Sequence, residues 1–394
     1  MNMQKRTHCK MIVAMGVVVL ILTTFLVSPS VSQTVPIKIG TFTPLSGHAA
    51  YYGEHIVIGA KLAIDEVNEK GGLLGRKIEF IAEDDKNVPA EAVTAAEKLI
   101  TKDQVVALSA SMGSSPVLAV MPKVNEAKIP MFVQTATSVL ITQQSGKGGN
   151  PWTFKCNPND AMMLTALAKF IVEKRGVKSV CFIGEDTDFG RGIVKGLKDW
   201  MEANGVKILS EDYVKGGETE FTPLLTKVKG LKPDVLGLGV VGPTQIQALV
   251  KQMLELGMKI PLTGRYDITA KQIADYIASG AMEGSTCVEP YSHLYEGGRN
   301  AQFVQMVKTK LGRDTGIYWW GVYWSYEATR VMLEAIKQGG KAERQAIRDA
   351  AAKVEMELIT GVKVKFDDNN QWHPPAFITG VKDGKIVLFG DVLT

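Results

Sequence analysis

The sequence predicts an α/β protein of two hinge-linked lobes, in which each lobe is a parallel sheet flanked by helices. Short apolar runs alternate with segments of helical spacing, and strands that are joined by a crossover of helix length are parallel. The alternation is interrupted at residues 152–160 and then resumes as a second set. At 394 residues, with 45% apolar and 22% charged residues, the chain has ordinary globular composition but is long for one core.

The N-terminal segment has the layout of a signal peptide. Lys5, Arg6 and Lys10 precede an apolar run at 11–27, and small residues follow, so we expect cleavage after Ser32 and export to the periplasm. An uncleaved membrane anchor is the alternative, although the run is slightly shorter than the about 20 residues that span a bilayer. The net charge of +4 comes largely from this basic segment. The nearly neutral remainder argues against a nucleic-acid partner, which would require a basic surface.

The first strand–helix–strand unit, residues 37–85, indicates where a ligand would bind. Its first strand runs into a turn at 44–47, and its helix ends at 71–72, where two glycines tolerate the left-handed backbone of a helix C-terminus. A second strand completes the unit. Ligands of parallel sheets bind beyond the C-terminal ends of the strands. Residues 43–53, which include Tyr52, therefore lie on the expected binding edge.

Two clusters of small hydroxyl residues follow the next two strands. The first cluster, residues 109–115, follows an apolar strand and precedes Pro116, which opens a helix. The second cluster, residues 134–138, follows the strand at 129–133. Hydroxyls and free backbone N–H groups at a helix N-terminus attract an anion, so we predict an anion site here. The alternative is that these residues only cap helices.

The second set of elements predicts a facing lobe. Its expected elements, in chain order, are a helix at 161–174, a strand at 179–184, a helix at 190–204, a strand at 206–213, a short helix near 224, a strand at 235–238, a helix at 244–256, a strand at 260–263, a helix at 270–278 and a strand at 284–289. The loops at 185–190, 239–242 and 264–267 follow strands and should form this lobe's half of a cleft. The aromatic cluster at 318–326 has helical spacing, which is more typical of core packing than of a ligand platform. A charged helix and three β runs close the chain.

No pattern of catalytic, metal-binding or cofactor-binding residues is complete. Residues 237–242 match the glycine pattern of a dinucleotide site, but no acidic residue ends the next strand, and loop glycines account for the match. The histidines lack zinc spacing, and no nucleophile elbow occurs. Cys156, Cys181 and Cys287 form no CxxC pair, and the latter two are expected to pack as small hydrophobes. We expect no metal, no cofactor and no enzymatic activity, with a nucleotide-dependent enzyme as the least favoured alternative.

The motifs of the first third resemble those of the branched-chain amino acid-binding proteins of ABC transporters. They run in the order LSG, YG, a helix ending NEKGG, then GRKIEF, EDD and PAEA. That family consists of two-lobed type I periplasmic binding proteins, and the resemblance extends over residues 37–389. It implies the following division of the chain: a signal peptide at 1–32, lobe 1 at 34–155 and 290–373, lobe 2 at 156–289, and a hinge crossing with the end of lobe 2 at 374–394.

The resemblance also implies an extracytoplasmic solute-binding component of an ABC importer, which we expect to be a monomer. Such a protein captures a small carboxylate-bearing ligand by hinge closure and is then recognised by a membrane permease. The family's carboxylate-binding residues fall at Ser114 and Thr137, with a backbone contact at Thr135. Tyr52 and Phe189 should cover the body of the ligand. A ligand-sensing regulatory protein on the same fold is the alternative, which the export signal disfavours.

The sequence departs from the family at the group that receives the ligand's ammonium. Tyr266 stands where the family has an acidic residue, with Asp267 next to it, and Val241 stands where the family has a tyrosine. A buried ammonium needs a charged or hydrogen-bonding partner. We expect Tyr266 to face the cleft, unless the loop is re-aimed by one residue so that Asp267 does. The ligand is thus a branched-chain amino acid or a related aromatic or aliphatic carboxylate.

Overall fold

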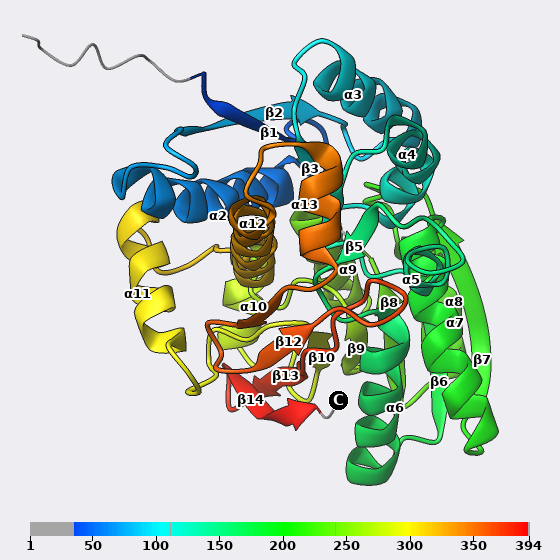
Figure 1. The fold of residues 1–394 in the computed structure, drawn as a ribbon. Coiled ribbons are helices and arrows are strands. Elements are labelled where there is room, and N and C mark those ends of the chain that lie inside the picture. The colour runs from blue at the N-terminus through cyan, green and yellow to red at the C-terminus, as the bar shows by residue number, and fades with distance from the viewer. Residues whose placement is uncertain (1–34, 111, 241, 393–394) are drawn as a thin grey trace, which may run out of the picture. The chain divides into compact units, whose positions relative to one another are not determined.

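The computed structural model describes residues 35–110, 112–240 and 242–392. The predicted signal peptide, residues 1–32, lies outside the described residues, and so does Val241. Within the described ranges, no helix is long and apolar enough to cross a membrane. These ranges contain two parallel sheets, a three-stranded antiparallel sheet and a two-stranded antiparallel hairpin, together with helices (Figure 1).

The first sheet is parallel throughout, as the sequence predicts. Its strands pair in the order β2-β1-β3-β4-β5. They are β1 (Ile37–Thr43), β2 (Ile78–Asp84), β3 (Ala107–Ser109), β4 (Met131–Val133) and β5 (Thr153–Lys155). Successive side chains of a strand point to opposite faces, so Ile39 of β1 joins one hydrophobic core and Phe42 joins the other. The sheet is therefore covered on both faces, as parallel sheets usually are.

Helices from the two ends of the chain cover this sheet. Their bounds are α2 (Ala50–Glu69), α3 (Pro89–Thr101), α4 (Ser114–Ala127), α5 (Val139–Gln143), α11 (Asn300–Leu311), α12 (Trp319–Gly339) and α13 (Arg344–Ala351). α3 and α4 pack together on one face, and α2 and α12 lie side by side (Figure 1). The approach of α2 to α12 is so close that a Cβ on Gly59 would lie 2.2 Å from the carbonyl oxygen of Val322. The last third of the chain therefore packs against the first.

The second sheet is also parallel, with the strand order β7-β6-β8-β9. Its strands and helices are β6 (Ser179–Glu185), β7 (Lys207–Val214), β8 (Val235–Gly239), β9 (Leu262–Arg265), α6 (Asp160–Arg175), α7 (Asp188–Ala203), α8 (Thr222–Leu231), α9 (Pro243–Glu255), the 3-10 helix η1 (Lys271–Ile273) and α10 (Ala274–Ala278). Cys181 and Cys287 are buried in the hydrophobic core on this sheet, which confirms their prediction as small core residues. The second alternating set thus forms its own sheet.

A third sheet, which the sequence analysis did not predict, takes up the strand that was expected at 284–289. β10 (Thr286–Glu289) pairs antiparallel with β13 (Ala376–Lys382), and β13 pairs antiparallel with β14 (Lys385–Val392). β11 (Glu355–Glu357) and β12 (Lys363–Lys365) form a separate antiparallel hairpin. An apolar run indicates a strand but does not specify a distant partner, so the pairing of β10 with β13 required the structure.

Buried polar side chains tie together two of the segments that leave the first sheet. Lys155 is fully buried, and its Nζ donates hydrogen bonds to Ala136 O at 2.9 Å and Asn157 Oδ1 at 2.7 Å. Gln371, which is also buried, donates from Nε2 to Asn157 O at 2.7 Å. Burial lowers the pKa of Lys155 to about 7. Because these buried polar groups are hydrogen-bonded to one another, the segment after β5 and the segment before β13 are held in fixed positions relative to each other.

Candidate ligand-binding site

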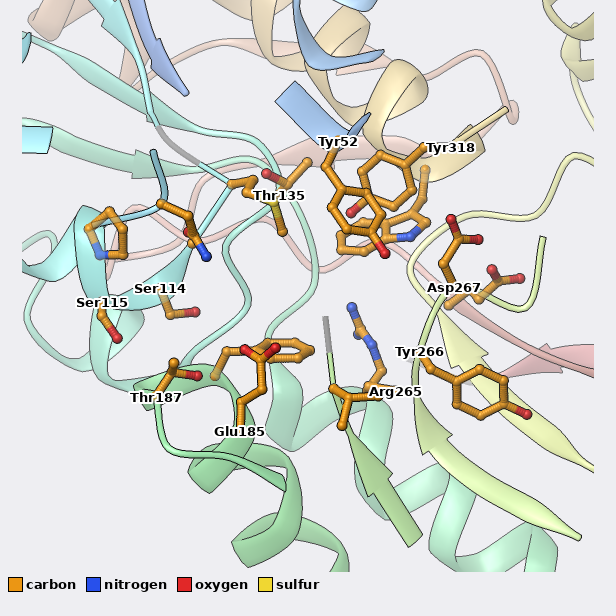
Figure 2. Close-up of a pocket in the computed structure, with 18 of the residues that line it drawn as sticks. Tyr52, Ser114, Ser115, Thr135, Glu185, Thr187, Arg265, Tyr266, Asp267 and Tyr318 are labelled. Atoms are coloured by element: carbon orange, nitrogen blue, oxygen red, sulfur yellow. The ribbon is translucent and has the colours of Figure 1, made fainter. Parts of the chain in front are cut away.

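A cavity of about 200 Å³ lies at the C-terminal ends of the strands of both parallel sheets. Hydroxyl, aromatic and charged side chains share its wall (Figure 2). The lining residues are Tyr52, Asn87, Pro89, Met112, Gly113, Ser114, Ser115, Pro116, Thr135, Glu185, Asp186, Thr187, Phe189, Val240, Arg265, Tyr266, Asp267, Val288, Glu289, Tyr318 and Trp320. The cavity therefore lies at the edge where the sequence places a ligand site.

Two hydroxyl groups from neighbouring strand ends meet in the cavity. Ser114 opens α4, and its Oγ accepts a hydrogen bond from the backbone N–H of Ser138 at 3.3 Å, which leaves its O–H group to donate. Thr135 follows β4, and its Oγ1 has no hydrogen-bond partner among the residues that the structure describes. Ser138 instead caps α5 by accepting from the backbone N–H of Leu140. The capping interpretation therefore applies to Ser138, while Ser114 and Thr135 face the cavity.

Thr137 lies behind the cavity wall. It is fully buried and is not among the lining residues. Its carbonyl oxygen accepts a hydrogen bond from the backbone N–H of Asp160 at 2.9 Å. The hydroxyl that the structure brings to the cavity is thus that of Thr135, for which the family resemblance implies only a backbone contact. The strand end at 134–138 supplies the predicted donor, but from a position two residues earlier.

Aromatic rings form the apolar part of the wall. Tyr52 of α2 packs edge-to-face on Tyr318 at a centroid distance of 4.4 Å, and Tyr318 packs on Trp320 at 4.6 Å. Phe189, near the start of α7, lines the cavity from the second sheet. The predicted aromatic cluster is therefore divided, because Tyr318 and Trp320 at the start of α12 line the cavity. The three later aromatic residues are core residues, as predicted: Tyr323, Trp324 and Tyr326.

Arg265 is a lining residue that the sequence analysis did not single out. It ends β9, is 2% exposed, and directs its guanidinium toward the middle of the cavity (Figure 2). Its Nη1 donates to Met163 Sδ at 3.0 Å and lies 3.9 Å from Asp160 Oδ1. Its Nη2 has no hydrogen-bond partner within the described part of the chain. The available signal was a charged residue in the loop 264–267, directly after the strand that was expected at 260–263.

Tyr266 and Asp267 point in different directions. The Tyr266 ring packs in the core of the second sheet and points away from the other labelled residues in Figure 2. Asp267 Oδ1 accepts from the backbone N–H and the hydroxyl of Thr269, at 3.0 and 2.6 Å, whereas no described residue hydrogen-bonds to its Oδ2. Burial raises the pKa of Asp267 to about 6. Along an extended chain, neighbouring side chains alternate, which places Arg265 and Asp267 on one side and Tyr266 on the other.

Two further carboxyl groups line the cavity, at the last residues of β6 and β10. They belong to Glu185 and Glu289, which are both buried. Glu289 Oε2 accepts a hydrogen bond from the hydroxyl of Thr379 at 2.9 Å. Burial, with the nearby charge of Asp267, raises the pKa of Glu289 to about 8, so this carboxyl is largely protonated near neutral pH. Val241, the other residue predicted from the family pattern, is not described, but its neighbour Val240 lines the cavity.

Comparison with known proteins decides the family. The profile of a family described as periplasmic binding protein matches residues 36–385. The chain belongs to the periplasmic binding protein family. The Leu/Ile/Val/Thr/Ala-binding protein of Pseudomonas aeruginosa is 26% identical to this periplasmic binding protein over 356 residues, covering 88% of this chain and 92% of the relative. The Leu/Ile/Val-binding protein of Escherichia coli K12 is 23% identical over 297 residues, which cover 75% of this chain and 79% of the relative. The predicted resemblance to branched-chain amino acid-binding proteins is confirmed.

Solved structures share the fold of this periplasmic binding protein. The leucine-binding protein of Thermotoga maritima superposes with a TM-score of 0.78 at 22% identity, covering 90% of this chain and 98% of that one. A solute-binding protein of an ABC transporter from R. palustris, in complex with benzoate, superposes with a TM-score of 0.81 at 22% identity. The superposition covers 91% of this chain and 96% of that one. These similarities confirm the predicted two-lobed type I fold.

Proposed function

We propose that this periplasmic binding protein captures a small carboxylate-bearing ligand between its lobes and delivers it to the membrane permease of an ABC importer. The observation that carries the proposal is the cavity at the strand ends of both sheets, whose lining includes the hydroxyl groups of Ser114 and Thr135 and five aromatic residues. The names of the relatives support it, since they include amino acid-binding proteins. Related folds have also been solved with benzoate and with 3,4-dihydroxybenzoic acid.

The carboxylate would bind to the hydroxyls of Ser114 and Thr135. Ser114 is the first residue of α4, so the partial positive charge of the helix N-terminus adds to its hydroxyl. The body of the ligand would lie against Tyr52 and Phe189, as the family resemblance implies. An amino acid would place its ammonium at Asp267, while an aromatic or aliphatic acid would use the rings alone. Both classes remain within the proposal.

Closure of the lobes would create the form that the permease recognises. The backbone N–H of Asp188, at the start of α7, donates to the hydroxyl oxygen of Ser115, near the start of α4, at 3.1 Å. This hydrogen bond joins the helix N-termini on the two sides of the cavity. We also propose that the protein works as a monomer outside the cytoplasm, with its lobe boundaries where the family resemblance puts them. N-terminal sequencing of the exported protein should then find a chain that begins at Gln33.

The experiment that tests the proposal compares acids with their amides. Thermal unfolding of the mature protein is measured with leucine, isoleucine, benzoate and 3,4-dihydroxybenzoate, and then with leucinamide and benzamide. A ligand that binds only the folded state raises the melting temperature. At least one acid should raise it, and its amide should not. Equal stabilisation by an acid and its amide would contradict carboxylate recognition.

A further inference from the structure

A buried guanidinium with unused donors faces the cavity opposite the hydroxyl groups. Arginine offers five N–H donors in a planar fork. In the structure, Arg265 uses one of them on the thioether sulfur of Met163, which is a weak acceptor, and the carboxylate of Asp160 lies 3.9 Å away, beyond hydrogen-bonding distance. Nη2 finds no partner in the described ranges of the chain. A buried charged group without hydrogen bonds is costly, so this site favours a ligand that accepts them.

The charges around Arg265 can accommodate an anion. Asp160 and Lys155 are also buried, and both lie near enough to affect one another's ionisation. When all three groups are ionised, this cluster carries one net positive charge. Lys155 directs its hydrogen bonds to Ala136 and Asn157, so Arg265 is the cationic member that reaches the cavity. This cluster therefore attracts a negative group, whereas the carboxylate of Asp267, which also lines the cavity, repels one.

Two aromatic rings lie within cation–π distance of the guanidinium. The Arg265 Cζ atom lies 5.1 Å from the Trp320 ring centroid and 5.9 Å from that of Phe189. Cation–π contacts of this kind stabilise the guanidinium without using its N–H donors. A planar fork that is held in place suits a carboxylate, which it can bind through two parallel hydrogen bonds. The hydroxyl groups of Ser114 and Thr135 lie on the other sheet's side of the cavity (Figure 2).

We propose that Arg265 determines specificity by receiving a second carboxylate, so that the ligand is a small dicarboxylate held at both ends. One carboxylate would bind to Ser114 and Thr135, and the other to the Arg265 fork. The aromatic rings would enclose the carbon skeleton between them. This inference rests on the proposed function, because it assumes that the first carboxylate binds to the hydroxyl groups.

The test uses pairs of ligands that differ by one carboxylate. Calorimetry on the mature protein compares benzoate with isophthalate and terephthalate, and hexanoate with adipate. In at least one pair the dicarboxylate should bind roughly tenfold or more tightly, because hydrogen bonds to charged groups are the strong ones. In Arg265→Met this preference should disappear, while Arg265→Lys, which keeps the charge but loses the fork, should retain part of it. Arg175→Met, on the exposed end of α6, is the matched control and should keep the full preference.

The outcomes separate this inference from the proposed function. If monocarboxylates bind and no dicarboxylate binds more tightly, the proposed function stands and the role of Arg265 is wrong. A preference that survives in Arg265→Met would also overturn it. If amides bind as well as acids, the proposed function itself fails. The comparison within the wild-type protein remains decisive even if Arg265→Met does not fold.

Discussion

Single side chains divide the cavity into a wall of neutral donors and a wall of charged groups. Ser114 and Thr135 supply the neutral donors, while Arg265 and Asp267 supply the charges. All four are buried, so each hydrogen bond to a ligand forms away from bulk water. The effects of substituting these residues should therefore be large for binding and separable from effects on folding.

Ser114→Ala and Thr135→Val should each weaken carboxylate binding by roughly 1.5–3 kcal/mol, the usual contribution of a hydrogen bond to a charged group. Ser138→Ala is the control, because it removes a helix cap and should lower the free energy of unfolding by about 0.5–2 kcal/mol without a comparable loss of affinity. Calorimetry and urea denaturation measure the two effects. If Thr137→Ala weakened binding as strongly as Thr135→Val, the family pattern would hold at Thr137 after all.

Binding of an amino acid should depend on pH through Asp267. An ammonium requires this carboxyl in its charged form, and the raised pKa of about 6 means that it becomes protonated as the pH falls below that value. Leucine affinity should therefore decrease from pH 7.5 to pH 5, and Asp267→Asn should remove the dependence. Calorimetry at the two pH values checks this. An unchanged leucine affinity at pH 5 would show that Asp267 does not pair with an ammonium.

The sequence predicts the kinds of site residue better than their orientation. Strand ends followed by hydroxyl clusters are visible in the sequence, and these clusters do meet in the cavity. Whether Tyr266 or Asp267 faces the ligand depends on backbone direction at the end of β9, which apolar periodicity does not specify. Arg265 was not recognised for a different reason. A charged residue at a strand end is usually exposed to solvent, so its burial in the cavity could not be expected.

At the scale of elements, the contact between α2 and α12 links the first and last thirds of the chain. Gly59→Ala would place a Cβ 2.2 Å from the backbone oxygen of Val322, so the helices would have to move apart. We expect a loss of about 1–3 kcal/mol in the free energy of unfolding, as for overpacked cores. Gly230→Ala in α8 is the matched control, since an added Cβ there meets nothing within 4 Å, and it should stabilise the protein by about 0.5–1 kcal/mol. Urea denaturation of both variants checks this; equal effects would contradict the close contact.

The parallel pairings were predictable, whereas the antiparallel pairing of β10 with β13 was not. A strand followed by a helix and another strand leaves only one sense of pairing, which is why β1 to β4 and β6 to β9 agree with the prediction. β5 lies within residues 152–160, where the sequence analysis expected an interruption and no strand. β10 and β13 are separated by three helices and a hairpin, so no local connection fixes their pairing. Pairings between distant segments depend on how the helices between them pack.

At the scale of the whole molecule, the hydrogen bond between Asp188 and Ser115 joins the two sides of the cavity and, under the proposed hinge closure, should stabilise the closed form. Ser115→Ala should leave the unfolding free energy of the ligand-free protein nearly unchanged. The substitution should weaken the binding of chemically different ligands by a similar amount, about 0.5–1.5 kcal/mol. The reason is that the hydrogen bond would stabilise the closed form of the protein and not the contact with one particular ligand. Calorimetry with leucine and with benzoate measures the loss of affinity for each ligand. A loss confined to one of them would indicate that Ser115 contacts that ligand directly, since it also lines the cavity.

The burial of the side chains proposed to hold the ligand has a consequence for the rate at which a ligand dissociates. Ser114, Thr135, Arg265 and Asp267 are at most 5% exposed, so the groups proposed to hold the ligand lie deep in the cavity. If release requires the two sides of the cavity to separate, as hinge closure implies, that opening is a property of the protein and not of the ligand. Stopped-flow dissociation rates should therefore approach a common upper limit as ligands become weaker. Rates that kept rising with weaker affinity would point to an exit route that does not require opening.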